Sequence, residues 1–500
     1  MTRNLLFDRL LGAGDPGALA IDAGARRYAY GDLDRQTARY ANALTVLGVR
    51  PGDRVAARVE KSAANLILYL AVVRAGAVYL PLNTAYTLAE LAYFIGDAEP
   101  ALIVCDPAAR DGVAALAARA AVETLDAAGE GSLATLAAGH LDAFATVARG
   151  PGDLAAICYT SGTTGRSKGA MLTHRALASN AETLVDLWGF TADDVLIHAL
   201  PIYHVHGLFV ATNVILMAGA SMILQPRFNP ADVMAAAARA TCLMGIPTFY
   251  TRLLAHPGLT REAVAGMRLF ISGSAPLLAQ THHDWTARTG KPILERYGMT
   301  ETGMNTSNPY DGDRVAGTVG FPLPGVALRI VDEETGAEVD DGRIGMIEVM
   351  GPNVCAGYWR NAGKTAEAFR PDGFFITGDL GVRDARGYVS IVGRGKDLII
   401  TGGLNVYPKE VEAEIDALPG VVESAVIGLP HADFGEAVTA VVAVGVGGGL
   451  SEQAVLEALA PRLARFKQPK RVLFVADLPR NAMGKVQKAR LREDHAALYA

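Results

Sequence analysis

The sequence predicts an α/β protein that consists of a large N-terminal domain with layered sheets and helices and a small α+β C-terminal domain. Helical and strand patterns alternate at short spacing from about residue 30 onward, which is typical of layered α/β domains. Past Gly320 the strands become shorter and turns follow closely, which indicates a β-rich subdomain. A chain of 500 residues, half of them hydrophobic, also exceeds what one core usually contains.

Composition excludes several classes of protein. The net charge of −6 and the pI near 6.0 provide no basic field for nucleic acid or an anionic membrane. The four cysteines are far apart, so neither a zinc site nor a disulfide framework is expected. Asp8 and Arg9 interrupt the apolar core that a signal peptide would need. A cytoplasmic protein is therefore expected.

The first elements follow from hydrophobic spacing. Apolar residues recur at helical spacing over 31–48, and a turn at Pro51–Arg54 leads into a strand over 55–59. A second helix over 61–76 and a second strand over 77–82 repeat the pattern. The Ala-rich part over 108–149 has helical propensity and carries no chemical constellation.

One uncharged run is long enough to cross a bilayer. Residues 205–224 contain no formal charge apart from His206. Asn213, Gly207 and Gly219 interrupt the run, so we interpret it as a buried helix, a turn and a strand over 221–224.

The chemical signals start at residues 159–169, Tyr-Thr-Ser-Gly-Thr-Thr-Gly-Arg-Ser-Lys-Gly, which follow a buried strand over 154–158. Hydroxyls and bare N–H groups in such a segment can surround a phosphate. The segment is not a Walker A loop, because Gly169 follows Lys168 where Ser or Thr is required. A flexible linker is the alternative, but interleaved hydroxyls and two cations are unusual in a linker.

This pattern resembles the phosphate loop of the acyl-adenylate-forming superfamily, which includes acyl-CoA synthetases, firefly luciferase and the adenylation domains of peptide synthetases. Further motifs of that superfamily follow in its order, at residues 200–207, 271–276, 295–302, 377–380, 401–412 and 478–488. The resemblance implies an AMP-forming acid–thiol ligase with an adenylating domain over 1–395 and a small mobile domain over 396–500, joined at Gly393-Arg394-Gly395. ATP, Mg²⁺ and CoA are the implied cosubstrates and metal.

The resemblance also assigns roles to residues. ATP binding falls to Thr160, Ser161, Gly162, Thr163, Thr164, Gly165, Lys168, Ser274, Ala275, Pro276, Glu295, Arg296, Tyr297, Gly298, Met299, Thr300, Asp379, Arg394 and Lys485. The implied catalytic residues are Lys485, His204, Thr300 and Glu301. Glu301 is the hard oxygen ligand for Mg²⁺, which usually takes one or two carboxylates. Lys396 is the implied hinge, and Gly402 and Gly403 line the tunnel for the thiol arm.

The stretches 80–91, 243–250 and 304–309 resemble bacterial malonyl-CoA synthetases, which also accept methylmalonate. A dicarboxylate needs a cation for its distal carboxylate, and arginine suits that task. Arg252 is the first candidate and Arg314 the second, although Arg252 is equally well explained as a helix-surface arginine. His206, Ser274 and Met304 are the other residues assigned to the acyl pocket.

The expected reaction has two halves. A carboxylate and MgATP give acyl-AMP and diphosphate, and the thiol of CoA then displaces AMP. Two alternatives remain open: a ligase for short monocarboxylates, and an adenylating module that does not use CoA, against which the Gly402-Gly403 pair argues. Acetylation of Lys485 by a lysine acetyltransferase, reversed by a deacetylase, is an expected form of control because it removes the charge.

Overall fold

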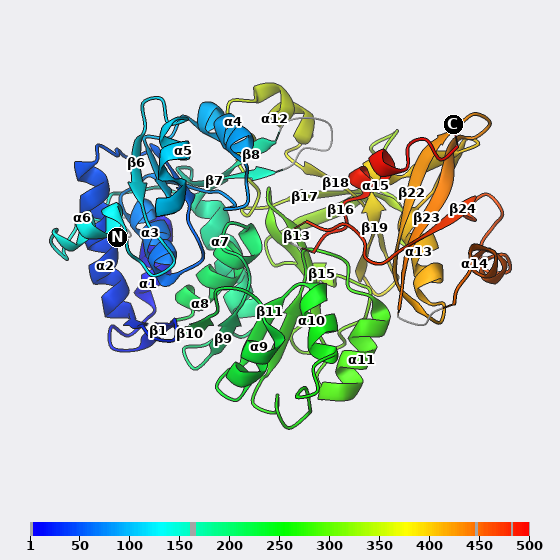
Figure 1. Cartoon of the computed structure of the whole chain (residues 1–500), viewed down its shortest axis with the longest axis horizontal. Helices are drawn as coiled ribbons and strands as arrows, with labels where there is room; N and C mark the ends of the chain where they lie inside the picture. The colour runs from blue at the N-terminus through cyan, green and yellow to red at the C-terminus, as the bar shows by residue number, and fades with distance from the viewer. Residues whose placement is uncertain (1–3, 161–166, 446–448, 482–483, 500) are drawn as a thin grey trace. The chain divides into compact units, whose positions relative to one another are not determined.

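The computed structural model describes residues 4–160, 167–445, 449–481 and 484–499. The chain divides into two compact units. The first comprises residues 1–327 and 349–375, and the second comprises 328–348 and 376–500. The described residues form four sheets (Figure 1). The mixed α/β fold predicted above is confirmed, and the boundary between residues 395 and 396 stays a prediction.

One sheet of the first unit has the strand order β6-β5-β3-β4-β7-β8 and is parallel except for β8. Its strands are β3 (Arg54–Arg58), β4 (Val78–Pro81), β5 (Leu102–Cys105), β6 (Ala121–Thr124), β7 (Leu154–Thr160) and β8 (Lys168–Thr173). The helices of this part are α2 (Tyr30–Val46), α3 (Ala63–Arg74), α4 (Leu88–Ala98), α5 (Arg110–Ala114) and α6 (Ser132–Ala138). The predicted helices over 31–48 and 61–76 and the strands that follow them are confirmed.

The helical expectation for residues 108–149 is wrong in part. Strand β6 lies within this stretch and pairs in parallel with β5. Its residues Val122 and Thr124 are β-branched and extend the sheet beyond β5, so the pairing outweighs the helical propensity of the neighbouring alanines.

The other sheet of the first unit has the order β15-β14-β13-β12-β11-β9-β10-β1-β2. Its strands are β1 (Leu19–Asp22), β2 (Arg27–Ala29), β9 (Val195–His198), β10 (Ser221–Leu224), β11 (Cys242–Gly245), β12 (Leu269–Ser272), β13 (Leu294–Met299), β14 (Gly303–Ser307) and β15 (Phe321–Pro322). The helices α1 (Leu5–Gly12), α7 (His174–Leu187), α8 (Asn213–Met217), α9 (Pro230–Ala237), α10 (Pro247–Leu254), α11 (Ala279–Thr289) and α12 (Ala362–Ala368) complete the unit.

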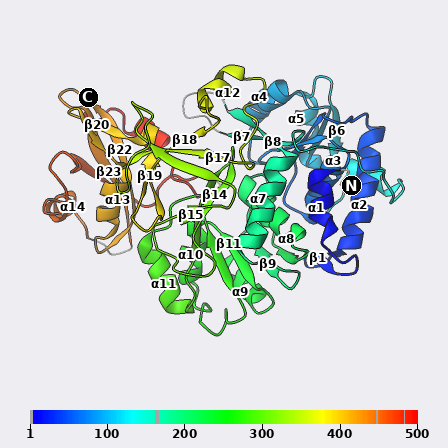
Figure 2. The same cartoon turned by 180° about the vertical axis from the view of Figure 1, so that it is seen from behind.

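Strands β10, β9, β11, β12 and β13 run parallel, so their carboxyl ends share one edge of the sheet. Helices α9, α10 and α11 lie beside these strands in both views (Figures 1 and 2). A core around Phe270 and Trp285 fixes them there. Loops that follow the carboxyl ends of parallel strands are the usual place for a ligand in such sheets.

The uncharged run at residues 205–224 is buried core, as predicted. It forms a π-helix over His206–Thr212, then α8, a turn at Gly219 with φ of +69°, and strand β10. In the part of the chain that the structure describes, no helix is both long and apolar enough to cross a membrane.

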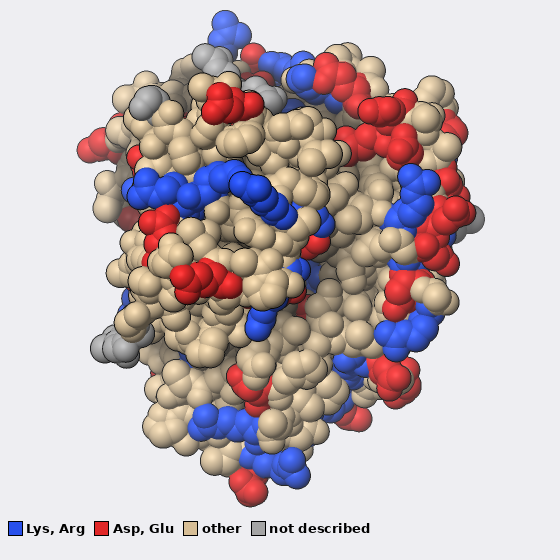
Figure 3. Space-filling view, turned by 90° about the vertical axis from the view of Figure 1, so that its right-hand side faces the viewer, with Lys and Arg blue, Asp and Glu red and all other residues tan. Residues whose placement is uncertain are grey.

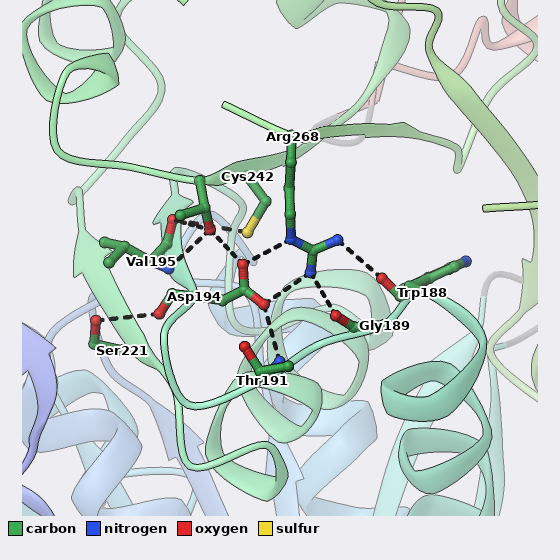
Figure 4. Close-up of polar contacts among 9 residues, drawn as sticks. Trp188, Gly189, Thr191, Asp194, Val195, Ser221, Cys242 and Arg268 are labelled. Atoms are coloured by element: carbon green, nitrogen blue, oxygen red, sulfur yellow. Dashed lines mark hydrogen bonds and ion pairs between the residues drawn. The ribbon is translucent and has the colours of Figure 1, made fainter. Parts of the chain in front are cut away.

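A buried ion pair ties the strands together at the opposite edge of the sheet (Figure 4). Arg268, just before β12, donates from Nε and Nη2 to the carboxylate of Asp194, just before β9, at 2.8 Å each. Thr241, just before β11, donates to the same carboxylate at 2.6 Å. Burial acts to raise the pKa of Asp194, but the hydrogen bonds from Arg268 and Thr241 outweigh it and hold this pKa below its ordinary value.

The second unit contains a sheet of order β16-β17-β18-β19 and another of order β21-β20-β23-β22, with β24 beside β23. Its strands are β16 (Ala327–Val331), β17 (Gly345–Met350), β18 (Phe375–Arg383), β19 (Val389–Arg394), β20 (Ile399–Thr401), β21 (Leu404–Val406), β22 (Val421–His431), β23 (Gly435–Val444) and β24 (Arg471–Val475), and its helices are α13 (Pro408–Asp416), α14 (Glu452–Leu459) and α15 (Lys488–Asp494). Acidic and basic side chains are interspersed over the face shown in Figure 3.

Replacement of Asp194 by Asn tests the ion pair. We expect Asp194→Asn to lower the free energy of unfolding by about 3 kcal/mol, because it leaves the half-buried Arg268 cation without its counter-charge. The folded-state pKa of Asp194 is below the unfolded value near ~3.9, so the deficit is fully present above that pH and shrinks on further acidification. Denaturant titrations across pH measure it, with the exposed neighbour change Asp193→Asn as control; a deficit that does not depend on pH contradicts the prediction.

Candidate active site

The ends of the phosphate loop are held by two tyrosines. Ser161, Gly162, Thr163, Thr164 and Gly165, which the sequence assigns to phosphate binding, lie outside the described residues. Thr160 and Lys168 pair across β7 and β8 at the two ends of that segment. Tyr159 donates its hydroxyl to Asp97, and Tyr93 donates to the carbonyl of Ser167 at 2.6 Å. Both ends of the loop are therefore anchored to helix α4.

Glu301 lies beside Thr160, at the start of this segment. It is 5% exposed and follows β13 in the turn that leads to β14. Thr160 and Tyr358 donate to its Oε1 at 3.3 and 3.0 Å. Among the described residues no group of three or more acidic, His or Cys side chains could hold a metal. A single carboxylate beside a phosphate loop still fits Mg²⁺, which keeps waters and phosphates as its other ligands.

The segment 295–300 carries the residues assigned to adenine and the α-phosphate. The register of β13 against β14 shifts between Tyr297 and Gly298, and a Cβ at Gly298 would overlap the carbonyl of Gly303. Tyr297, Met299 and Thr300 are half-buried, so their side chains are reachable by a ligand. Glu295 accepts from the Gly317 N–H at 3.1 Å, which joins this strand to the loop at 317.

His206, Ser274 and Met304, which the sequence assigns to the acyl pocket, lie after β9, after β12 and on β14. Ser274 has a φ of +71°, a left-handed conformation that is costly for a residue with a Cβ. Its hydroxyl lies 3.1 Å from Nδ1 of His206. Ala275 and Pro276 continue the same loop. His204 precedes the π-helix that starts at His206.

Arg296 is the buried cation of this pocket. It is 3% exposed, and a Cβ at Gly273 would overlap its guanidinium, so the two lie in direct contact. Within the described chain, Nε and Nη2 of Arg296 and Nε2 of His206 have no hydrogen-bond partner. Because buried donors are almost always paired, the two unsatisfied nitrogens of Arg296 fit a ligand that brings an acceptor.

Burial controls the charges here. It lowers the pKa of Arg296 to about 9, which still leaves the guanidinium protonated at neutral pH. Burial, and then the charge of Arg296, lowers the pKa of His204 to about 4 and that of His206 well below its ordinary value. Both imidazoles are therefore neutral, and Arg296 is the cation of the pocket.

The two arginines proposed from the sequence for the distal carboxylate differ in their exposure and in their contacts. Arg252 is exposed on α10. Arg314 donates to the backbone carbonyls of Pro309, Pro292 and Tyr310, so its guanidinium is used to hold a loop. Met304 is buried on β14 at 2% exposure. Arg252 and Arg314 both stay predictions for the carboxylate-binding group.

In the second unit, Asp379 and Arg394 face each other across β18 and β19. Their Oδ1 and Nε are 2.8 Å apart, and Arg394 also donates to the carbonyl of Thr377. Two causes lower the pKa of Lys485: packed atoms keep solvent from its ammonium, and the charge of Arg394 is near. Part of the residue is nevertheless exposed. The assigned pair and the assigned lysine therefore lie close together within this unit.

The proposed hinge and tunnel residues also lie in this unit. Lys396 is in a short 3₁₀ turn, and burial lowers its pKa. Gly402 and Gly403 form the turn between β20 and β21 with φ of +57° and +79°. These values favour glycine there, and nothing lies within 4 Å of a Cβ at Gly403.

Sequence reasoning missed the burial of Arg296 and the contact of Tyr358 with Glu301. Arg296 is the third residue of a strand whose first three residues are all buried, and a charged residue within a buried strand is a signal that could have been used. Tyr358 lies in Gly-Tyr-Trp, and nothing in its local sequence indicates a distant carboxylate.

The fold and the family and relatives described next show an AMP-forming acid–thiol ligase, an enzyme that uses ATP. The family model described as "AMP-binding enzyme" matches residues 11–359, and the model of the "AMP-binding enzyme C-terminal domain" matches 410–485. The chain belongs to the family of AMP-binding enzymes.

The names of the relatives give different acids as substrates. The chain is 36% identical to a malonate–CoA ligase of Mus musculus over 97% of its length and 90% of the relative. It is also 36% identical to a feruloyl-CoA synthase of Amycolatopsis over 95% and 96%. Among solved structures, ATP-bound MatB from Rhodopseudomonas palustris superposes with a TM-score of 0.98 at 64% identity, with all of both chains covered.

The left-handed backbone at Ser274 predicts an order of stability. Ser274→Ala and Ser274→Gly both lose the hydroxyl near His206, but only glycine adopts a φ of +71° without strain. We expect the glycine variant to be more stable than the alanine variant by about 1 kcal/mol. Thermal or denaturant unfolding measures the difference, and equal stabilities would contradict a strained backbone at this position.

Proposed function

We propose that this enzyme is a malonyl-CoA synthetase, which also accepts methylmalonate. In this proposal it converts malonate, MgATP and CoA into malonyl-CoA, AMP and diphosphate through a malonyl-adenylate. The similarity to malonate–CoA ligases supports the substrate. The observation that carries the proposal is the buried, unsatisfied guanidinium of Arg296 within β13.

The contribution that Arg296 makes to substrate binding in this proposal is electrostatic. A buried cation without a counter-charge destabilises the free enzyme, and a carboxylate that accepts from Nε and Nη2 removes that cost. A monocarboxylate has no second anionic group once its only carboxylate is at the reaction centre. A dicarboxylate places one carboxylate at the phosphate and the other on Arg296, where the neutral His206 can donate a further hydrogen bond.

In this proposal the other residues serve the two half-reactions. Asp379 and Arg394 hold the ribose, Tyr297 stacks on adenine, and Thr300 donates to the α-phosphate. Glu301 holds Mg²⁺, which screens the charge of the triphosphate. Lys485 neutralises charge that develops between the carboxylate and the α-phosphate, a kind of contribution worth roughly 3 kcal/mol. His204 controls access to the thiol, Lys396 is the hinge, and Gly402 and Gly403 leave room for the pantetheine arm of CoA.

Two alternatives remain. The acid could be a monocarboxylate, for which the feruloyl-CoA synthase relative gives a specific reason to include an aromatic acid in assays. An adenylating module that does not use CoA is excluded if AMP release depends on CoA. We also propose the cytoplasm as the location and Lys485 as a target of acetylation and deacetylation.

The substrate test compares Arg296→Met with the matched control Arg252→Met. We expect the wild type to prefer malonate over acetate, propionate, succinate and ferulate in CoA-dependent AMP formation. Loss of the charge-assisted hydrogen bonds in Arg296→Met should lower kcat/KM for malonate about 100-fold and that for propionate much less. Arg252→Met should stay within about twofold, as expected for a surface side chain.

Two outcomes of that comparison contradict the assignment. A wild type that prefers a monocarboxylate would remove malonate as the substrate. An equal fall for malonate and propionate in Arg296→Met would show that Arg296 serves the nucleotide or the fold instead of the distal carboxylate.

Lys485→Ala separates the half-reactions. We expect malonate-dependent diphosphate exchange to fall about 100-fold, because the charge that offsets the transition state is lost. Thioester formation from supplied malonyl-AMP should stay within about threefold, since no role for Lys485 is proposed in that step. The exposed Lys364→Ala is the control, and an equal loss in both half-reactions would contradict the role of Lys485.

A further inference from the structure

A short segment of the first unit joins the phosphate loop to Glu301. Residues 355–359 run beside β8, where the N–H of Met171 donates to Gly357 and the N–H of Trp359 donates to Gly169, at 2.9 and 2.8 Å. At its start, the N–H of Cys355 donates to the carbonyl of Glu301 at 2.7 Å. One backbone segment is therefore fixed both to the strand that leaves the loop and to the residue that carries the carboxylate.

Tyr358, the fourth residue of this segment, is 5% exposed. Its hydroxyl donates to Oε1 of Glu301 at 3.0 Å, and the hydroxyl of Thr160 donates to the same oxygen at 3.3 Å. Two donors on one carboxylate oxygen fix the rotation of the group and leave its other oxygen, Oε2, for a cation. An anionic carboxylate held in this way is suited to bind a cation through one oxygen.

The ring of Tyr358 has a second contact. The ammonium of Lys168 lies 4.3 Å from the ring centroid, over its face. A cation–π contact is weaker than an ion pair and leaves the N–H donors of the ammonium available. The ring therefore keeps Lys168 at the end of the phosphate loop and near Glu301 without neutralising either charge.

We infer that Tyr358 is a positioning residue for magnesium-bound nucleotide: its hydroxyl orients Glu301 toward the metal, and its ring holds Lys168 ready for phosphate. This inference rests on the proposed use of MgATP. It adds a residue with two separable tasks, one carried by the hydroxyl and one by the ring. Tyr358→Phe removes the first task only, and Tyr358→Leu removes both.

The test is equilibrium binding of a non-hydrolysable ATP analogue by calorimetry, with saturating Mg²⁺ and with EDTA, in the absence of any carboxylic acid. In the wild type, Mg²⁺ should tighten binding. In Tyr358→Phe we expect this gain to fall about tenfold, as for a lost hydrogen bond to a charged group, while metal-free binding stays unchanged. In Tyr358→Leu the metal-free affinity should fall as well. Tyr28→Phe, on β2, is the control and should match the wild type.

A full magnesium gain in Tyr358→Phe would overturn the inference, and so would an equal loss with and without Mg²⁺, which is what a purely structural role predicts. Melting temperatures of the variants show whether the fold is intact. The binding assay needs no acid substrate, so a wild type that fails to form AMP with malonate would overturn the proposed function while the comparison still decides the role of Tyr358.

Discussion

The candidate site depends on one electrostatic constraint: the guanidinium of Arg296 is buried at 3% exposure without a carboxylate from the described protein. A buried cation is costly, and proteins usually pair it. Here the contact with Gly273 holds Arg296 in place, and its charge helps to keep His204 and His206 neutral. The pocket therefore has one cation and two neutral imidazoles, which suits a ligand that carries its own extra carboxylate.

The scaffold holds that arrangement through the parallel strands. The Asp194–Arg268 pair and Thr241 fix the starts of β9, β11 and β12, so the loops at the other ends of these strands are placed by the sheet. His206 belongs to a π-helix that follows β9, a distortion that is frequent at functional sites. Ser274 adopts a left-handed backbone after β12. The irregular backbone of the pocket is thus attached to a regular and strongly bonded sheet.

Much of the fold could be predicted from the sequence, because the spacing of apolar residues gives local structure directly. The helices over 31–48 and 61–76 and the interpretation of residues 205–224 as core all follow from local pattern. Strand β6 could not be found in this way, because its pairing with β5 overrides the propensity of an Ala-rich stretch. Local pattern describes a strand, and not the neighbour that stabilises it.

In the candidate site, too, some assignments follow from local sequence and others depend on tertiary structure. Motifs placed Glu301, Asp379 and Lys485 in the candidate site because each lies in a recognisable stretch. Arg252 and Arg314 stay predictions for the cation that binds the acid, because exposure and hydrogen bonding to backbone carbonyls depend on tertiary structure and not on local sequence. Arg296 lies in a motif that was assigned to nucleotide binding. Its burial and its unsatisfied nitrogens, on which the proposed contact with the acid rests, depend on tertiary structure.

The most direct test of the central claim is a crystal structure of the enzyme with malonate and AMP. The account predicts that the distal carboxylate of malonate accepts hydrogen bonds from Nε and Nη2 of Arg296, at about 2.8 Å. A carboxylate bound to Arg252 or Arg314, with the nitrogens of Arg296 contacting water or the nucleotide, would contradict the claim that this buried cation selects a dicarboxylate.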